Sequence, residues 1–328
     1  MRVVFFGSGE FGIPTFDSIA FDGHEIAAVV TQPDRARGRG KEPKPTPLKA
    51  AALEAGVEVI SPERVNSPDV VERIKSYSAD LGYVAAFGQK IGTELLSAFP
   101  AGMVNLHGSL LPAYRGAAPV QWAVINGDET TGVTVFRLVE KMDAGPILVQ
   151  RRTAIGADET ADELHDRLAR IGCDAVRETL KMLERDPKCP GEPQDESRAT
   201  LAPKLKKSDG FITFDMPVRK LAARICGLWS WPGAQCRFIS ADGKRDEVVT
   251  LARAASYEGR STATPLTDSL GRVSAVMSVQ AADADLAILE IKPSNSRLMS
   301  WQDFVNGRRV EPGDRFIPIG VPVAERAE

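Results

Sequence analysis

The sequence predicts an α/β protein in two parts: a Rossmann-like, mostly parallel sheet covered by helices, then a linker and a small β barrel. Three observations predict this fold class. Short, nearly continuous apolar runs alternate with helical patterns up to about residue 183, which is typical of parallel strands buried on both faces. From about residue 230, short strand-like runs follow one another with Gly or Asp turns between them. A length of 328 residues also exceeds what one core usually organises.

These patterns place a first domain at residues 1–186, a linker at residues 187–207 and a second domain at residues 208–328. The linker contains four prolines among mixed charges, which is typical of a connecting segment. No internal repeat or low-complexity tract interrupts either domain.

The composition is globular and excludes several classes of function. Hydrophobic residues make up 43% of the chain and charged residues 26%, and the net charge of −3 excludes a uniformly basic nucleic-acid coat. The four cysteines form no CxxC pair and have no nearby histidine, which argues against a zinc site or a disulfide framework. The apolar run after Met1 is too short for a signal or membrane segment. We therefore expect a cytoplasmic protein with no metal and no DNA or membrane partner. Nothing in the sequence demands a dimer, and we expect a monomer.

The first strand, RVVFF, ends in a glycine-rich turn. Gly7, Gly9 and Gly12 form a GxGxxG pattern between this strand and a helix. A dinucleotide site would also need an acidic residue after the next strand, but the strand at 25–30 runs into Thr-Gln-Pro. We therefore interpret the glycines as residues that permit a tight turn and close helix packing.

The next stretch, DRARGRGKEPKPTPLK, is strongly basic. It holds six cations against two acidic residues, and its glycines and prolines prevent a helix before Thr46, a plausible N-cap with Pro47 at the first helical position. One interpretation is a solvated charged loop. The other is an arm that contacts phosphates, because Arg and Lys on a mobile backbone can neutralise them at close range.

The remaining elements continue the alternation and then change character. In the first domain, we expect helices ending near 56 and at 67–76, 119–126 and 160–183, with strands at 57–60, 81–87, 132–138 and 146–149. In the second, we expect a helix at 218–228 and strands at 235–239, 247–252, 273–279 and 286–291.

The stretch MVNLHGSLLPAYRG, residues 103–116, stands out chemically. Asn105 and His107 lie two residues apart at the end of an apolar run, so in a strand both side chains leave from the same face. The loop that follows is rich in Gly, Ser and Pro, and ligands of α/β sheets bind at the carboxyl ends of strands. Asp143, in KMDAGP, is a distant candidate partner.

These residue types suit acyl transfer to an amine. An imidazole can accept a proton from an attacking amine, and a neighbouring carboxylate would orient the ring and make it more basic. An Asn amide can donate to negative charge developing on a carbonyl oxygen. Ser109 is a weak nucleophile candidate, because the chain has no GxSxG turn. Taken alone, the NxH pair could equally be two polar residues satisfied within a turn.

Several motifs together carry a family resemblance. HGSLLPAYRGAAP, with Asp143 in MDAG, resembles the signature of the 10-formyltetrahydrofolate-dependent formyltransferases. FFGSGEFGIP and TQPDRARGRGK resemble the first turn and the basic loop of those members that formylate initiator methionyl-tRNA. KLKKSDG, WSWPGA and MSWQDFVNGRR extend the resemblance nearly to the end of the chain.

The resemblance implies 10-formyltetrahydrofolate as co-substrate and initiator methionyl-tRNA as acceptor, for use in translation initiation. Asn105, His107 and Asp143 match the family's catalytic trio. The residues that match its folate-contacting segment are Ser109, Leu110, Leu111 and Pro112. The residues that match the loop inserted at the tRNA acceptor end are Arg37, Arg39 and Lys41. The second domain resembles the family's oligonucleotide-binding-like barrel, which holds tRNA.

The chain departs from the family pattern twice. Asn295-Ser296-Arg297 stands where the family has Gly-Lys-Lys, so one basic contact is missing or shifted, and Ile212-Thr213-Phe214 replaces Ile-Asp-Trp as a packing change. Other functions remain open at this point: formyl transfer to a small amine such as glycinamide ribonucleotide or an amino sugar, hydrolysis of formyltetrahydrofolate, or non-catalytic tRNA binding.

Overall fold

The computed structural model describes residues 1–36, 42–257 and 269–320. Its contacts divide the chain into two compact units that interleave along the sequence. Unit 1 consists of Met1–Pro119, Thr130–Ala154 and His165–Pro203, and unit 2 consists of Val120–Glu129, Ile155–Leu164 and the chain from Lys204 onward. The division predicted from the sequence, at 1–186, 187–207 and 208–328, stays a prediction.

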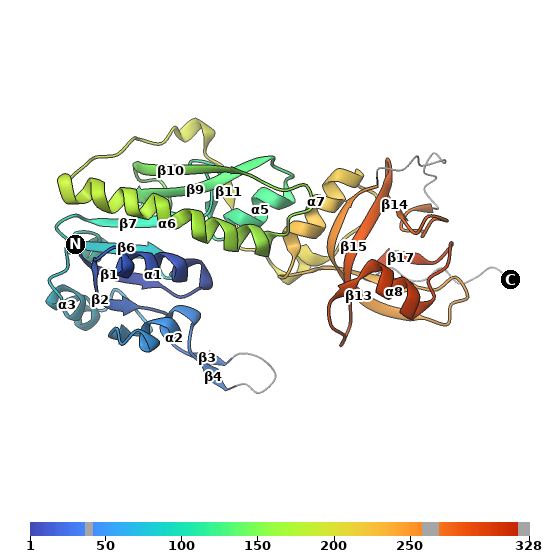
Figure 1. Ribbon diagram of the computed structural model, residues 1–328, viewed down its shortest axis with the longest axis horizontal. Helices are drawn as coiled ribbons and strands as arrows, with labels where there is room; N and C mark the ends of the chain where they lie inside the picture. The colour runs from blue at the N-terminus through green and yellow to red at the C-terminus, as the bar shows by residue number, and fades with distance from the viewer. Residues whose placement is uncertain (37–41, 258–268, 321–328) are drawn as a thin grey trace. The chain divides into compact units, whose positions relative to one another are not determined.

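Unit 1 is built on a seven-stranded sheet, whose strands can be followed across Figure 1 from β10 to β2. Its order is β10 (Ile147–Ala154), β9 (Thr130–Arg137), β7 (Met103–His107), β6 (Leu81–Ala85), β1 (Arg2–Gly7), β2 (Glu25–Val30) and β5 (Val59–Ile60). From β7 to β5 all neighbours pair in parallel, whereas β9 is antiparallel to both β7 and β10. The predicted Rossmann-like, mostly parallel sheet is confirmed.

Helices cover both faces of this sheet. Their bounds are α1 (Ile13–Phe21), α2 (Pro47–Glu54), α3 (Pro68–Ser76), α4 (Thr93–Leu96) and α6 (Ala161–Arg185). On one face, Phe6 and Met103 share a buried cluster with Ile74 of α3. On the other, Phe5 packs edge-on against Phe16 of α1 at 5.9 Å between ring centroids. Strands buried on both faces explain why these segments are apolar throughout instead of alternating.

The glycine turn after β1 brings segments into close contact. A Cβ atom at Gly7 would lie 2.7 Å from both the Ala85 carbonyl oxygen and Leu48 Cδ2, which is too close for any side chain. Gly12 likewise lies against the ring of Phe5, where a Cβ would be 3.3 Å away. This geometry supports the interpretation that the glycines serve tight packing. Thr46 also caps α2 as predicted, its hydroxyl accepting the Lys49 N–H at 3.2 Å.

Unit 2 contains a small antiparallel barrel. Its main strand order is β14 (Val279–Gln280), β15 (Asp285–Pro293), β13 (Asp246–Ser256), β12 (Ala234–Ile239) and β17 (Arg315–Pro318), with β16 (Met299–Ser300) paired to β15. Arg272 bridges Arg315 of β17, and the next residue, Val273, bridges Val279 of β14, so these two residues link the two ends of the strand order and nearly close the sheet. The predicted C-terminal β barrel is confirmed. The strand predicted at 273–279 is wrong, because its two ends pair with each other as a tight loop.

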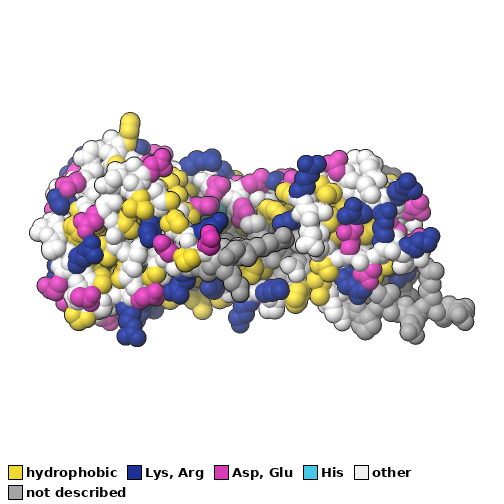
Figure 2. All heavy atoms as spheres, turned by 90° about the horizontal axis from the view of Figure 1, so that it is seen from below, with side chains coloured by type: hydrophobic (Ala, Val, Ile, Leu, Met, Phe, Trp, Pro, Cys, Tyr) yellow, Lys and Arg dark blue, Asp and Glu magenta, His cyan; other side chains and the backbone are white. Residues whose placement is uncertain are grey.

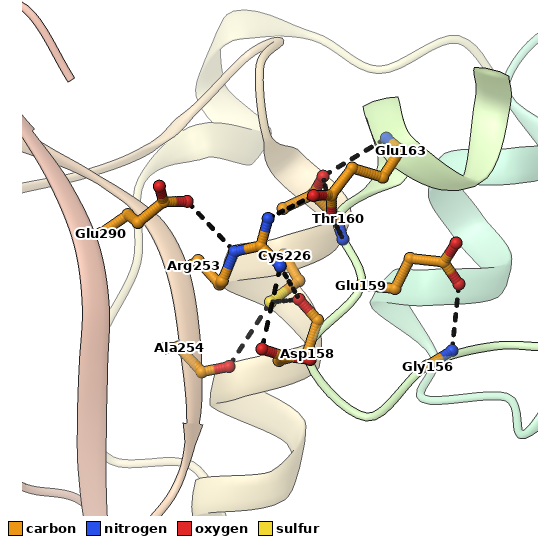
Figure 3. Close-up of polar contacts among 9 residues, drawn as sticks. All are labelled: Gly156, Asp158, Glu159, Thr160, Glu163, Cys226, Arg253, Ala254 and Glu290. Atoms are coloured by element: carbon orange, nitrogen blue, oxygen red, sulfur yellow. Dashed lines mark hydrogen bonds and ion pairs between the residues drawn. The ribbon is translucent and has the colours of Figure 1, made fainter. Parts of the chain in front are cut away.

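Two helices and a polar network complete unit 2. In α7 (Val218–Leu228), Gly227 allows close approach to Ile125 at the end of α5 (Pro119–Ile125), and α8 (Trp301–Arg308) packs beside β15 and β16. Figure 3 shows Arg253 of β13 at the centre of a network. Its guanidinium contacts Glu163, donates to Glu290 at 3.1 Å and reaches the Asp158 carbonyl oxygen at 3.2 Å. The segment 155–164 is thereby held to the barrel.

Candidate active site

The end of β7 presents the two polar side chains predicted from the sequence. Residues 103–107 form a strand, so Asn105 and His107 leave from one face and Leu106 from the other. Leu106 confirms the alternation, because its side chain packs against Gly172 of α6. Among the described residues, none is hydrogen-bonded to the Asn105 amide, which is partly exposed beside His107.

His107 is fixed by contacts to both ring nitrogens. Its side chain is only 6% exposed, and Nε2 lies 2.8 Å from the backbone carbonyl oxygen of Tyr114. A carbonyl oxygen can only accept, so Nε2 carries the hydrogen. Nδ1 then faces Asp143 Oδ2 at 3.9 Å, a distance suitable for an ion pair but too long for a hydrogen bond. Nδ1 is therefore the nitrogen that can take up a proton.

Asp143 comes from the loop after β9 and is held by its carboxylate and its backbone. Oδ2 accepts the Gly116 N–H at 2.8 Å, and the side chain is 13% exposed. Its φ of 48° lies in the left-handed region, which Asp tolerates better than most residues. The structure thus brings together all three residues of the predicted trio, since Asn105 and His107 share a strand face and Asp143 lies against His107.

The predicted folate-contacting segment runs alongside β9. Ser109 is fully buried and its hydroxyl donates to the Ala113 carbonyl oxygen at 2.6 Å, which suits a structural role better than a nucleophile. The Leu111 N–H donates to Thr134 Oγ1 at 3.0 Å, and Leu111 is 3% exposed. The other two residues of the segment, Leu110 and Pro112, are partly exposed.

Sequence reasoning missed the residues that hold this segment. Gln150 Nε2 donates to the Leu111 carbonyl oxygen at 2.9 Å, and the Thr134 hydroxyl donates to the Ser109 carbonyl oxygen at 2.7 Å. Thr134 lies on β9, which pairs with β7, and Gln150 lies on β10, which pairs with β9. Polar residues within these two strands were the available signal in the sequence.

A cavity of about 580 Å³ lies at the same edge of the sheet, in the loops that follow β5 and β6. It is lined by residues 64–68, Gln89 and Lys90. Arg64 and Lys90 are exposed, and within the described part of the chain neither forms an ion pair. Two cations beside a cavity suit an anionic group of a ligand. Neither residue belonged to a motif, so the sequence did not indicate them.

The predicted tRNA-contacting residues Arg37, Arg39 and Lys41 lie outside the described residues. On either side, β3 (Arg35–Ala36) and β4 (Pro43–Lys44) pair as a short antiparallel ladder. In residues 1–36, 42–257 and 269–320, no group of three or more His, Cys, Asp or Glu side chains could hold a metal ion. Over the same residues, no helix combines the length and apolar character needed to cross a membrane.

Comparisons with known proteins agree over most of the chain. The family model described as Formyl transferase matches residues 1–180, and that described as Formyl transferase, C-terminal domain, matches residues 204–309. The methionyl-tRNA formyltransferase of Solibacter usitatus is 40% identical over 318 residues, covering 96% of this chain and 98% of the relative. That of Heliobacterium modesticaldum is 37% identical, covering 96% of this chain and all of the relative.

A solved structure shares the fold. The sugar 3N-formyl transferase WlaRD, in the presence of dTDP and 5-N-formyl-THF, superposes with a TM-score of 0.63 at 14% identity, covering 90% of this chain and 99% of that one. The sequence relatives are far more similar to this chain than the solved structure is, and they cover 96% of it. The chain therefore belongs to the formyl transferase family and, within it, to the methionyl-tRNA formyltransferases.

Proposed function

We propose that the chain transfers the formyl group of 10-formyltetrahydrofolate to the α-amine of methionine on initiator methionyl-tRNA, in the cytoplasm, where translation begins. The observation that supports this most is the meeting of Asn105, His107 and Asp143 at the carboxyl end of β7, in a chain whose relatives act on methionyl-tRNA. Formyl transfer needs a proton acceptor and an oxyanion donor, and these residues supply both.

The reaction has two steps, addition of the amine to the formyl carbon and release of tetrahydrofolate. The amine nitrogen attacks the formyl carbon, a C–N bond forms, and the carbonyl oxygen becomes an oxyanion that the Asn105 amide stabilises. His107 Nδ1 takes the amine proton, and the resulting imidazolium is stabilised by Asp143. The bond between the formyl carbon and N10 then breaks, His107 returns the proton to N10, and tetrahydrofolate leaves.

Folate would bind along the edge of the sheet between the segment 109–112 and the cavity near Arg64. The exposed parts of Leu110 and Pro112 offer apolar contact, while Ser109 and Leu111 shape the segment from inside. The glutamate carboxylates of folate are anions, and Arg64 and Lys90 lie at the cavity without ion-pair partners among the described residues.

One assay tests this function against its alternatives. The purified chain with 10-formyltetrahydrofolate is offered charged initiator tRNA, glycinamide ribonucleotide, an amino sugar nucleotide or water alone, and formylated product and released formate are measured. We expect efficient transfer to charged tRNA only. Transfer to glycinamide ribonucleotide or to the amino sugar would instead identify a formyltransferase that acts on a small amine. Release of formate at a rate that no acceptor lowers would identify a formyltetrahydrofolate hydrolase. tRNA binding without folate binding would leave only the non-catalytic reading.

Among the described residues, the face of the molecule in Figure 2 shows no single block of basic side chains. On the face in Figure 2, described Lys and Arg side chains are interspersed with Asp and Glu. With a net charge of −3, tRNA affinity should rest on a few local contacts. The basic loop is the first candidate for them.

Replacing Arg39 with alanine should weaken the use of tRNA and flatten its salt dependence. Losing one phosphate contact lowers the slope of log affinity against log salt by about 0.7 to 0.9. The measurement is KM for charged tRNA over a series of salt concentrations. Arg73→Ala is the matched control, because Arg73 lies exposed on α3 and pairs with Glu58 at 2.7 Å. An Arg39→Ala slope equal to that of the wild type would favour the solvated-loop interpretation.

A further inference from the structure

Residues 192–202, here called the strap, lie against the reaction site although the sequence predicts a linker there. The strap belongs to unit 1 and begins by pairing with β10. Glu192 and Ile147 exchange two backbone hydrogen bonds of 2.7 Å. The strap ends as β11 (Leu201–Ala202), which pairs in parallel with β8 (Arg115–Gly116). It therefore touches both loops that meet at His107.

The strap holds the Asp143 loop through a single amide. Gln194 Nε2 donates to the Asp143 carbonyl oxygen at 2.8 Å and to the Gly145 carbonyl oxygen at 2.7 Å. Gly145 also packs directly against the end of β9, because a Cβ there would lie 1.7 Å from the Arg137 carbonyl oxygen. Gln194 thus fixes the backbone from which the Asp143 carboxylate extends.

The strap also holds the segment that orients His107 and Asp143. Thr200 Oγ1 accepts the Tyr114 N–H at 2.8 Å, and the Ala202 carbonyl oxygen accepts the Ala117 N–H at 2.9 Å. Between these two attachments lie the Tyr114 carbonyl oxygen that receives His107 Nε2 and the Gly116 N–H that binds Asp143. Both groups that fix the His107–Asp143 geometry are therefore anchored to the strap.

Arg115 links the segment that orients His107 to Gln194 and Glu196 of the strap. Its side chain is buried, and its guanidinium donates to Gln194 Oε1 at 2.7 and 3.2 Å and to Glu196 at 3.0 and 3.1 Å. Hydrogen bonds from Arg115, and then from Lys141, lower the pKa of Glu196 to about 2. Glu196 is therefore ionised at neutral pH, and the ion pair persists there.

Position 194 requires a neutral amide. Its oxygen accepts from the cationic Arg115, while its nitrogen donates to two carbonyl oxygens. A carboxylate of the same shape could accept from Arg115, but its second oxygen would face the carbonyl oxygens of Asp143 and Gly145, which are also acceptors. Gln194→Glu is therefore a nearly isosteric change that should release the Asp143 loop.

We propose that the strap positions the reaction site and that Gln194 is a positioning residue acting through Asp143. Gln194 contacts no reacting atom. Its effect is to keep the Asp143 carboxylate opposite His107 Nδ1, where a displacement of about 1 Å can reduce turnover about 100-fold. This inference rests on the proposed function, because it assumes the role given there to Asp143.

A double-mutant cycle tests the path through Asp143. In the wild-type background, Gln194→Glu should lower kcat by about 10- to 100-fold and change KM for either substrate less than about 3-fold. In an Asp143→Asn background the same change should cost less than about 2-fold, because the carboxylate it positions is gone. Ser197→Ala is the control, since this exposed hydroxyl bonds only Asp195 within the strap. An equal loss in both backgrounds, or a loss confined to KM, would overturn the proposal.

Hydrogen exchange supplies a readout that needs no substrate. Backbone amides in peptides covering 112–118 and 141–146 should exchange at least about 10-fold faster in Gln194→Glu than in the wild type or Ser197→Ala, while peptides from α3 stay unchanged. Unaltered protection of both loops would show that the strap does not hold them. A wild-type chain that formylates no acceptor would overturn the proposed function instead, and the exchange measurement would still decide the role of the strap.

Discussion

Replacing His107 with glutamine is expected to lower kcat for formyl transfer by about two to four orders of magnitude, the usual scale for general acid–base catalysis. Glutamine retains an N–H donor that can reach the Tyr114 carbonyl oxygen, which His107 Nε2 contacts at 2.8 Å. It offers no nitrogen that can accept a proton where Nδ1 faces Asp143. The substitution therefore removes the proposed base while preserving the local hydrogen bond.

Single-turnover transfer to charged initiator tRNA is the appropriate measurement, because it isolates chemistry from product release. His165→Gln is the matched control, since this side chain is 29% exposed on α6 and pairs with its neighbour Asp166. The thermal unfolding midpoint of each variant shows whether the fold is intact. A folded His107→Gln protein with transfer within a few-fold of the wild type would exclude His107 as the proton acceptor.

The sequence could predict the strand and face of the site because these follow from local periodicity. The apolar run at residues 103–107 predicts strand β7. The two-residue repeat of a strand then predicts that the side chains of Asn105 and His107 leave from the same face. Asp143 could be paired with them only through the family resemblance, because it is 36 residues distant and no local pattern links it to His107. The mostly parallel sheet could be predicted from similar apolar runs, because strands buried on both faces are apolar throughout whichever strands they pair with.

The strap could not be predicted because its order comes from contacts distant in sequence. Gln194 and Thr200 lie in a stretch without apolar periodicity, and their partners Asp143 and Tyr114 are 51 and 86 residues away. The predicted strand at 273–279 failed for a different, local reason: its apolar residues suit a strand, but Ser274 and Ser278 pair across a tight turn. Contacts distant in sequence order the strap, whereas hydrogen bonds within a turn outweigh strand propensity at 273–279.

Two substitutions of Asp143 can separate the effect of its charge from the effect of its hydrogen bond to Gly116. Its Oδ2 accepts the Gly116 N–H at 2.8 Å and lies 3.9 Å from His107 Nδ1. Asp143→Asn keeps an oxygen for Gly116 but removes the negative charge, whereas Asp143→Ala removes both. If the charge stabilises the imidazolium formed during transfer, both variants should lose about 100-fold or more in kcat.

The alternative is that Asp143 serves only to hold the Gly116 segment. In that case the Asp143→Asn variant should transfer formyl groups at nearly the wild-type rate, and only the Asp143→Ala variant should lose activity. Hydrogen exchange at Gly116 separates the variants independently of activity, since only Asp143→Ala should lose protection there. Asp174→Asn is the control for loss of a surface carboxylate, because Asp174 pairs with Arg177 on exposed α6 and such pairs contribute at most about 1 kcal/mol. If the Asp143→Asn variant keeps the Gly116 amide protected from exchange but loses kcat, the effect is due to charge. The loop geometry is then unchanged, while the group opposite His107 Nδ1 has become neutral.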